Sequence, residues 1–300
     1  MRLSALFDEF LTFLRVEKEA APRSLETYRW CFGDFLAFAM QDVGGTVLVT
    51  HFTADRCRNY QYSLAGRGLQ ANSIRVRLAT LGSFGKWALR REKLDKNPLD
   101  LLTRPRRKAR LPRVPKWGTI QQLLAQSSDL RERALVALMA FGGLRRSEVV
   151  SLDVGDYAPE FGLRRVRGKG GQEAAVPLPE IARAIVSEYL AMHRANAVSR
   201  DPMFVVRYQT RPGTWRESRM TGHRVWKLIK ALGRRAGLPE LHPHAFRHSS
   251  GAELLRRTGG NLRVVQAHLR HADIQTTTVY TRLTQHELQQ AVSAFDQNET

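Results

Sequence analysis

Four side chains in the C-terminal part of the sequence have the chemistry needed to handle a phosphodiester. His244 and Arg247 are three residues apart, so on a helix they share one face. His271 and Tyr280 follow further along the chain. Arginine grips phosphate oxygens with a planar fork, histidine exchanges a proton near neutral pH, and tyrosine can attack phosphorus and hold it covalently. Together these residue types predict chemistry on a phosphodiester.

The segments that carry these residues resemble a known family. His244–His248, Leu269–His271 and Thr278–Thr281 are similar to the C-terminal catalytic block of the tyrosine recombinases, which include phage integrases and the Xer resolvases. The family pattern there is H-x-L-R-H, then L-G-H, then a tyrosine. This sequence differs from it twice. Phe246 replaces a Leu, which is a mild apolar change, and Arg270 replaces a Gly that would suit a positive φ.

Two upstream positions extend the resemblance. The run Gly-Leu-Arg-Arg-Ser-Glu resembles the first catalytic arginine motif of the family, with Arg145 as the arginine and Glu148 as the glutamate. Lys169 lies in a glycine-rich turn between two short alternating runs, which predicts a β-hairpin, and it matches the catalytic lysine of the family. The catalytic set that the resemblance implies is Arg145, Lys169, His244, Arg247, His271 and Tyr280.

The resemblance also implies how these residues divide the work of a site-specific DNA recombinase. Arg145, Arg247 and His271 would hold the phosphate oxygens while Tyr280 attacks phosphorus. In this scheme His244 is the candidate base for the tyrosine, and Lys169 would protonate the departing 5′ oxygen. A 3′-phosphotyrosine would keep the energy of the broken strand, so we expect no metal, no ATP and no other cofactor.

Three other functions are compatible with parts of this pattern. A type IB topoisomerase uses the same chemistry to nick and reseal DNA with one subunit. A metal-dependent relaxase also uses tyrosine, and the sequence is rich in possible metal-ligating imidazoles: His242, His244, His248, His268 and His271. A noncatalytic DNA-binding regulator is a further alternative, although the intact nucleophile and both arginines argue against it.

The composition points to a polyanionic partner. Lys and Arg number 48 against 28 Asp and Glu, a net charge of +20, which predicts binding to double-stranded DNA. A hydrophobic fraction of 43% suffices for packed cores. There is no apolar run of about 18 residues, so we expect no membrane span. The two cysteines have no metal-site spacing, which favours a reducing, cytoplasmic and nucleoid-associated location.

Helical periodicity predicts a mainly α protein in two parts. Residues 1–100 are expected to form a four-helix bundle resembling the core-binding, SAM-like domain that clamps DNA in this family. Residues 101–118 form a proline-interrupted basic linker, and residues 119–300 a mostly helical catalytic domain with a small β-sheet or hairpin. Thr53 is predicted to cap the third helix, Ser24 the second, and Thr119 the first helix of the catalytic domain.

Basic residues in the first two parts are candidates for contact with DNA. The basic run of the linker contains no acidic residue, so its like charges repel one another unless the phosphates of DNA neutralise them. The predicted DNA-binding residues are Arg75, Arg77, Lys86, Arg104, Arg106, Arg107, Lys108 and Arg110. Near the C-terminus, Leu288, Val292 and Phe295 form an apolar stripe that either covers its own domain or docks on a neighbouring subunit. The resemblance implies self-association to a tetramer on two DNA sites, with this stripe as a candidate contact.

Overall fold

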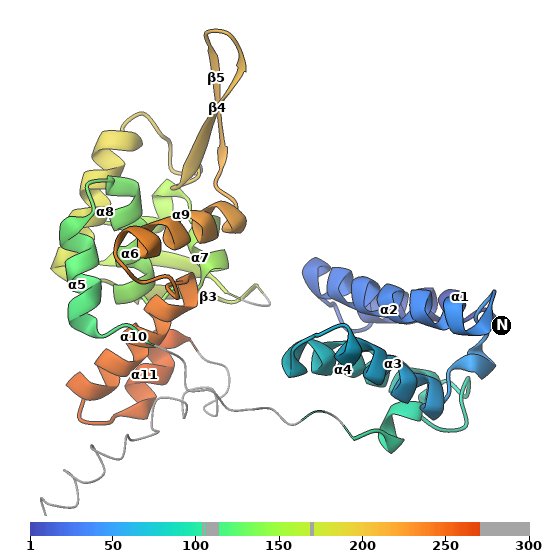
Figure 1. The fold of residues 1–300 in the computed structure, drawn as a ribbon. Helices are drawn as coiled ribbons and strands as arrows, with labels where there is room; N and C mark the ends of the chain where they lie inside the picture. Colours follow the sequence, from blue (N-terminus) through green and yellow to red (C-terminus); the bar gives the residue numbers. More distant parts are fainter. Residues whose placement is uncertain (104, 106–113, 169–170, 271–300) are drawn as a thin grey trace, which may run out of the picture. The chain divides into compact units, whose positions relative to one another are not determined.

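The computed structural model describes residues 1–103, 105, 114–168 and 171–270 (Figure 1). The chain divides into two compact units, Met1–Arg110 and Leu111–Thr300. Both units are mainly helical, as predicted, and the named strands all belong to the second unit. Within the described ranges, no helix is both long enough and apolar enough to cross a membrane.

The first unit contains the four predicted helices. They are α1 (Leu3–Val16), α2 (Pro22–Val43), α3 (Ala54–Gly66) and α4 (Ala71–Arg90), with two 3-10 turns, η1 (Val49–His51) and η2 (Pro98–Leu101). Thr53 caps α3 as predicted, because its hydroxyl accepts a hydrogen bond from the Arg56 amide at 3.3 Å. The second helix begins before Ser24, at Pro22, where a proline in the first turn has its φ already set for a helix.

Aromatic rings fill the core of this bundle. Phe7 of α1 stacks on Phe32 of α2, and Phe84 of α4 meets Phe32 edge-on with ring centroids 5.2 Å apart. All three side chains are buried. Burial of each such ring stabilises the fold by about 1.5–3 kcal/mol. The aromatic packing therefore holds the helices of the bundle together.

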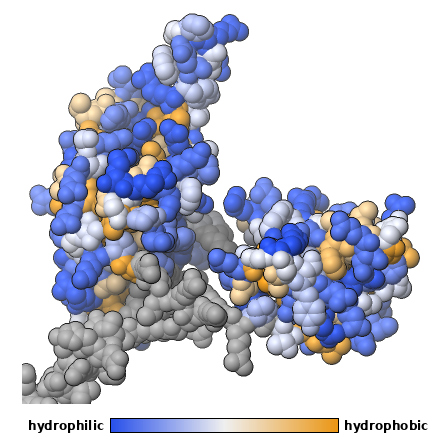
Figure 2. All heavy atoms as spheres, in the orientation of Figure 1, coloured by the Kyte–Doolittle hydropathy of each residue, from blue (hydrophilic) through white to orange (hydrophobic). Residues whose placement is uncertain are grey.

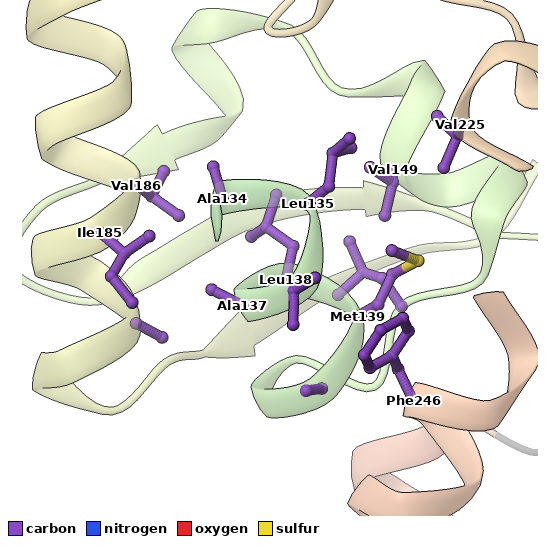
Figure 3. Close-up of a cluster of buried hydrophobic side chains, with 14 of the residues drawn as sticks. Ala134, Leu135, Ala137, Leu138, Met139, Val149, Ile185, Val186, Val225 and Phe246 are labelled. Carbon is purple, nitrogen blue, oxygen red and sulfur yellow. The ribbon is translucent and has the colours of Figure 1, made fainter. Parts of the chain in front are cut away.

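The second unit is built around one buried helix, α6 (Leu130–Phe141). It begins at the cap Asp129, whose carboxylate accepts from the amides of Arg131 and Glu132. Figure 3 shows Ile185 on one side of α6 and Phe246 on the other. The elements packed around α6 include α5 (Trp117–Gln126), α7 (Arg146–Ser151), α8 (Glu180–His193), α9 (Gly222–Arg235) and α10 (Pro243–Arg257). Helix α5 begins two residues before the predicted cap Thr119.

A three-stranded antiparallel sheet adjoins this helical core. The strand order is β1 (Tyr157–Ala158), β2 (Gly162–Arg167) and β3 (Glu173–Pro177). Strands β2 and β3 form the predicted hairpin. A second hairpin, β4 (Val205–Arg211) and β5 (Thr214–Arg219), occupies a stretch whose sequence predicts irregular structure apart from a short strand near Phe204. Most of its residues are exposed, and its surface in Figure 2 is largely hydrophilic. With little apolar alternation, sequence periodicity could not reveal it.

A partly buried ionic network joins three helices of the first unit. The carboxylate of Asp34 accepts hydrogen bonds from Tyr60 at 2.8 Å, Arg77 at 2.9 Å and Arg67 at 3.0 Å. Burial raises the pKa of Asp34, but the bonds from Tyr60, Arg77 and Arg67 outweigh it and leave the pKa below its ordinary value. The guanidinium of Arg77 also lies over the ring of Trp30. This network therefore stabilises the fold above the unfolded-state pKa, and loses that effect as pH falls through the folded-state pKa.

We predict that Asp34→Ala destabilises the first unit by about 3 kcal/mol, because it leaves a buried arginine and a buried phenol without their acceptor. The measurement is differential scanning calorimetry of the full chain. Asp42→Ala is the matched control, since Asp42 pairs with Arg56 at an exposed position and should contribute at most about 1 kcal/mol. Equal effects of the two substitutions would contradict the prediction.

Candidate active site

Three of the six predicted catalytic residues lie in the described part of the chain. Arg145 is at the start of α7, and His244 and Arg247 are in the first turns of α10. Lys169, His271 and Tyr280 lie outside the described residues, as does the stripe of Leu288, Val292 and Phe295. The geometry of the site is therefore that of the two arginines, the first histidine and their neighbours.

A double-glycine turn places Arg145. Helix α6 ends at Phe141, and Gly143 has a positive φ of 57°, a turn conformation that glycine adopts without strain, immediately before α7. A Cβ on Gly143 would lie 2.8 Å from the side chain of Leu269, so the turn also allows the end of α11 (Leu262–Leu269) to approach closely. Arg145 is then the N-cap residue of α7, where free backbone amides favour negative charge.

Glu148 fixes the position of Arg145. Its Oε2 accepts from the Arg145 amide at 2.8 Å, and its Oε1 accepts from the Arg145 guanidinium at 2.6 Å. The Glu148 side chain is only 3% exposed, whereas that of Arg145 is 34% exposed. Burial raises the pKa of Glu148, but the charge of Arg270 and the bonds from Arg145 outweigh it and hold the pKa below its usual value. A buried carboxylate thus orients an arginine that keeps a surface for a ligand.

Arg247 is held under the same turn. It is 4% exposed, and its guanidinium donates to the carbonyls of Gly143 and Leu269. These bonds connect α10 to the α6–α7 turn and to the end of α11. Phe246, the preceding residue, is fully buried against the core beside Met139, so the change from Leu is accommodated by apolar packing (Figure 3).

The histidines of α10 have different tasks. His242 caps the helix, since its Nδ1 accepts from the Ala245 amide at 3.1 Å. His244 has an exposed edge, yet partial loss of water around its ring, followed by the charges of Arg247, His242, Arg145 and Arg146, lowers its pKa. The imidazole of His244 is therefore neutral at neutral pH and able to accept a proton. Because Arg247 of α10 donates to the Gly143 carbonyl, two residues before Arg145, the starts of α7 and α10 lie near one another.

Several contacts around this region were not predicted. Ser250 Oγ lies 2.9 Å from His268 Nε2, and burial with the charges of Arg270 and Arg247 lowers the pKa of His268 to about 4. Burial and the neighbouring His244 likewise lower the pKa of His248 to about 4. Both rings are therefore neutral at neutral pH. Among the residues that the structure describes, no three His, Cys, Asp or Glu side chains are grouped closely enough to hold a metal ion.

Arg270 adopts the backbone conformation that favours the glycine of the family pattern. Its φ is 52° and its ψ 47°, a left-handed conformation that costs an L-residue about 1–2 kcal/mol. Its guanidinium donates to the carbonyls of Gly142, Gly143 and His268, and to Glu148 at 2.9 Å. The backbone requirement could be anticipated from the sequence pattern. The contacts with Gly142, Gly143 and Glu148 could not, because they join positions more than 120 residues apart.

The predicted DNA-binding residues of the described chain are placed differently from one another. Lys86 is exposed on α4, and Arg75 is half-buried and donates to the Pro105 carbonyl at 2.9 Å. Arg77 is only 6% exposed and is committed to Asp34 and Trp30 within the bundle. The linker residues Arg104, Arg106, Arg107, Lys108 and Arg110 lie outside the described residues.

Comparison with known proteins gives consistent family matches along the chain. Residues 118–287 match the Phage integrase family, and residues 7–92 match the Phage integrase, N-terminal SAM-like domain. The tyrosine recombinase XerC of Xylella fastidiosa (strain 9a5c) is 33% identical over 288 residues, covering 94% of this chain and 93% of that protein. XerD of Oceanobacillus iheyensis is 28% identical over 302 residues, covering 98% of both chains.

Solved structures share the fold. A XerH recombinase bound to a palindromic difH substrate matches with a TM-score of 0.72 and 20% identity, over 93% of this chain and 82% of that one. A lambda integrase fragment, a dimer bound to a core site, matches with a TM-score of 0.69 and 16% identity, over 93% and 95% of the two chains. With the sequence matches above, these findings show that the chain belongs to the phage integrase family and is a site-specific tyrosine recombinase that cuts and rejoins DNA.

Proposed function

We propose that Arg145, Arg247, His244, Lys169, His271 and Tyr280 form the catalytic site of this recombinase. The observation that carries the proposal is the shared turn at Gly142 and Gly143. It places Arg145 at the start of α7 and takes hydrogen bonds from Arg247 of α10, while both arginines act electrostatically on a neutral His244. The two arginines suit an anionic phosphate, and the neutral imidazole suits a nearby group that must lose a proton.

The reaction follows from the chemistry of these groups. Tyr280 Oη attacks phosphorus, and the bond from phosphorus to the 5′ oxygen breaks, which leaves a 3′-phosphotyrosine. At a reference pKa near 10, about a thousandth of a tyrosine is ionised at pH 7, a deficit of about 4 kcal/mol that His244 offsets by accepting the proton. Lys169 protonates the departing 5′ oxygen. A 5′ hydroxyl of the partner strand then attacks phosphorus and releases the tyrosine.

The arginines stabilise the charge that develops on the nonbridging oxygens, together with His271. Loss of one preorganised donor of this kind typically costs about 2.7–4 kcal/mol of transition-state stabilisation. Because each broken phosphodiester is retained as a phosphotyrosine ester, rejoining needs neither ATP nor a metal ion. The same chemistry in a single subunit would make a type IB topoisomerase, so strand exchange between two sites is the property that distinguishes the two functions.

We further propose how the rest of the chain serves this reaction. The bundle and the basic linker would clamp DNA, with Lys86 and Arg75 as the candidate contacts of the described bundle and the linker cations following the phosphates. Four subunits would assemble on two DNA sites, with the C-terminal apolar stripe as a contact. Cys31 and Cys57 are buried free thiols, which suits a cytoplasmic, nucleoid-associated protein.

The nucleophile can be tested by adduct formation in EDTA. DNA captured covalently by the wild-type protein in cells is sequenced, and a nicked duplex of that sequence serves as a suicide substrate. Tyr280→Phe should bind this DNA and give no covalent adduct on a denaturing gel, since only the attacking oxygen is removed. Tyr208→Phe, at an exposed position of β4, is the matched control and should form the adduct normally.

Two results would contradict this assignment. A persistent adduct in Tyr280→Phe would place the nucleophile elsewhere, although Tyr157 and Tyr189 already donate their hydroxyls to the carbonyls of Arg183 and Met203. Wild-type cleavage that is abolished by EDTA and restored by a divalent ion would favour the relaxase mechanism instead.

The linker can be tested by salt dependence. Replacing Arg106, Arg107 and Lys108 by Gln should weaken binding to all DNA sequences alike, and should reduce the slope of log K against log salt by about 0.9 for each phosphate that the linker no longer neutralises. A control variant removes three charges at Arg164, Arg256 and Arg257, which already pair with Glu160 and Glu253. An unchanged slope in the linker variant would make the segment a simple spacer.

The assembly can be tested by truncation after Gln285. If the stripe of Leu288, Val292 and Phe295 packs on a neighbouring subunit, the truncated protein should bind its site but recombine poorly. Sedimentation of the protein on its DNA and the melting temperature are measured together. A lower melting temperature with an intact four-subunit complex and normal recombination would mean that the stripe covers its own domain.

A further inference from the structure

The arginine at position 270 does more in this chain than replace a glycine. Its side chain is 14% exposed and folds back from the end of α11 over the turn that precedes Arg145. Two of its contacts are the carbonyls of Gly142 and Gly143, each at 3.2 Å. A third is the carbonyl of His268 at 2.9 Å. The left-handed backbone of Arg270 is thus accompanied by side-chain bonds that a glycine could not make.

The fourth contact connects Arg270 to the proposed phosphate-binding arginine. Glu148 Oε2 accepts from the Arg270 guanidinium at 2.9 Å and from the Arg145 amide at 2.8 Å. Glu148 Oε1 accepts from the Arg145 guanidinium. The same buried carboxylate therefore lies between two arginines, one mostly covered and one a third exposed.

We propose that Arg270 is a positioning residue for Arg145, which it serves by holding the Glu148 carboxylate in place and compensating part of its charge. This inference rests on the proposed function, in which Arg145 binds the scissile phosphate. The residue at this position does not itself touch the DNA in the proposal, because its guanidinium is directed at three carbonyls and a carboxylate.

Charge sharing gives the physical reason. Without Arg270, more of the negative charge of Glu148 would act on Arg145, in a poorly solvated position where opposite charges interact strongly. Arg145 would then be held more tightly by its own protein and would stabilise less well the charge that develops on the phosphate in the transition state. With Arg270 present, Glu148 still orients Arg145 through the amide and the guanidinium, while part of its charge is compensated from the other side. Among the described residues that contact this turn, the cations Arg145, Arg247 and Arg270 also outnumber the carboxylate of Glu148.

The test compares Arg270→Gly with wild type on the same nicked suicide duplex. We expect the first-order cleavage rate at saturating protein to fall by between about 10- and 100-fold, the range that misplacement of a catalytic group produces. The dissociation constant of the uncleaved duplex should change by less than about threefold, because Arg270 contacts protein. Arg263→Ala removes a charge from an exposed position of the same helix and should leave the cleavage rate unchanged.

A double-mutant cycle separates positioning from general loss of structure. In a Glu148→Gln background the carboxylate charge is already gone, so adding Arg270→Gly should slow cleavage much less than it does in the wild type. The same fold-loss in both backgrounds, or a wild-type rate in Arg270→Gly, would overturn the proposal. Wild-type protein that forms no adduct would instead contradict the proposed function.

A second pair of variants keeps the test valid if Arg270→Gly does not fold. Arg270→Lys and Arg270→Met both keep a Cβ in the left-handed position, so their melting temperatures should be similar. Lys can still pair with Glu148, whereas Met cannot. Cleavage by Arg270→Lys should therefore be faster than by Arg270→Met, and equal rates in the two folded variants would rule out a role through Glu148.

Discussion

The Gly142-Gly143 turn is the constraint on which the catalytic unit depends. The positive φ of Gly143 lies between the end of the buried helix α6 and Arg145, the N-cap of α7. The lack of side chains in the turn lets the end of α11 approach. The carbonyls of the turn accept hydrogen bonds from Arg247 and Arg270, which come from two different helices. The carbonyls of the two glycines thus hold Arg247 and Arg270 beside Arg145, because carbonyls at the end of a helix need hydrogen-bond donors from outside that helix.

A buried carboxylate supplies the second level of organisation. Glu148 is the partner of Arg145 in sequence and of Arg270 in space, and the cations around it keep it ionised. The excess of positive charge that remains lowers the pKa of His244 further than partial burial alone does. The electrostatic pattern suits a reaction that needs cations for the phosphate and a neutral imidazole for the proton.

The first unit shows that a basic residue in a DNA-binding protein can have a structural task. The sequence predicts that Arg77 approaches DNA with Arg75, but Arg77 is only 6% exposed and lies in a network with Asp34 and Tyr60. Lys86 is exposed on the same helix and makes no ion pair among the contacts described. The proposal for DNA binding by this helix therefore depends on Lys86 and Arg75.

Local sequence signals determined most of the elements and the order of the catalytic motifs. Thr53 caps α3, α6 spans Leu130–Phe141, and the predicted hairpin forms, because capping and periodicity act over a few neighbouring residues. The motifs around Arg145 and Arg247 were enough to nominate both arginines for the site. Only the tertiary structure decided that Arg77 is internal and that β4 and β5 pair. It also decided that Arg270 reaches Glu148, since burial and contacts between distant segments depend on how the whole chain packs.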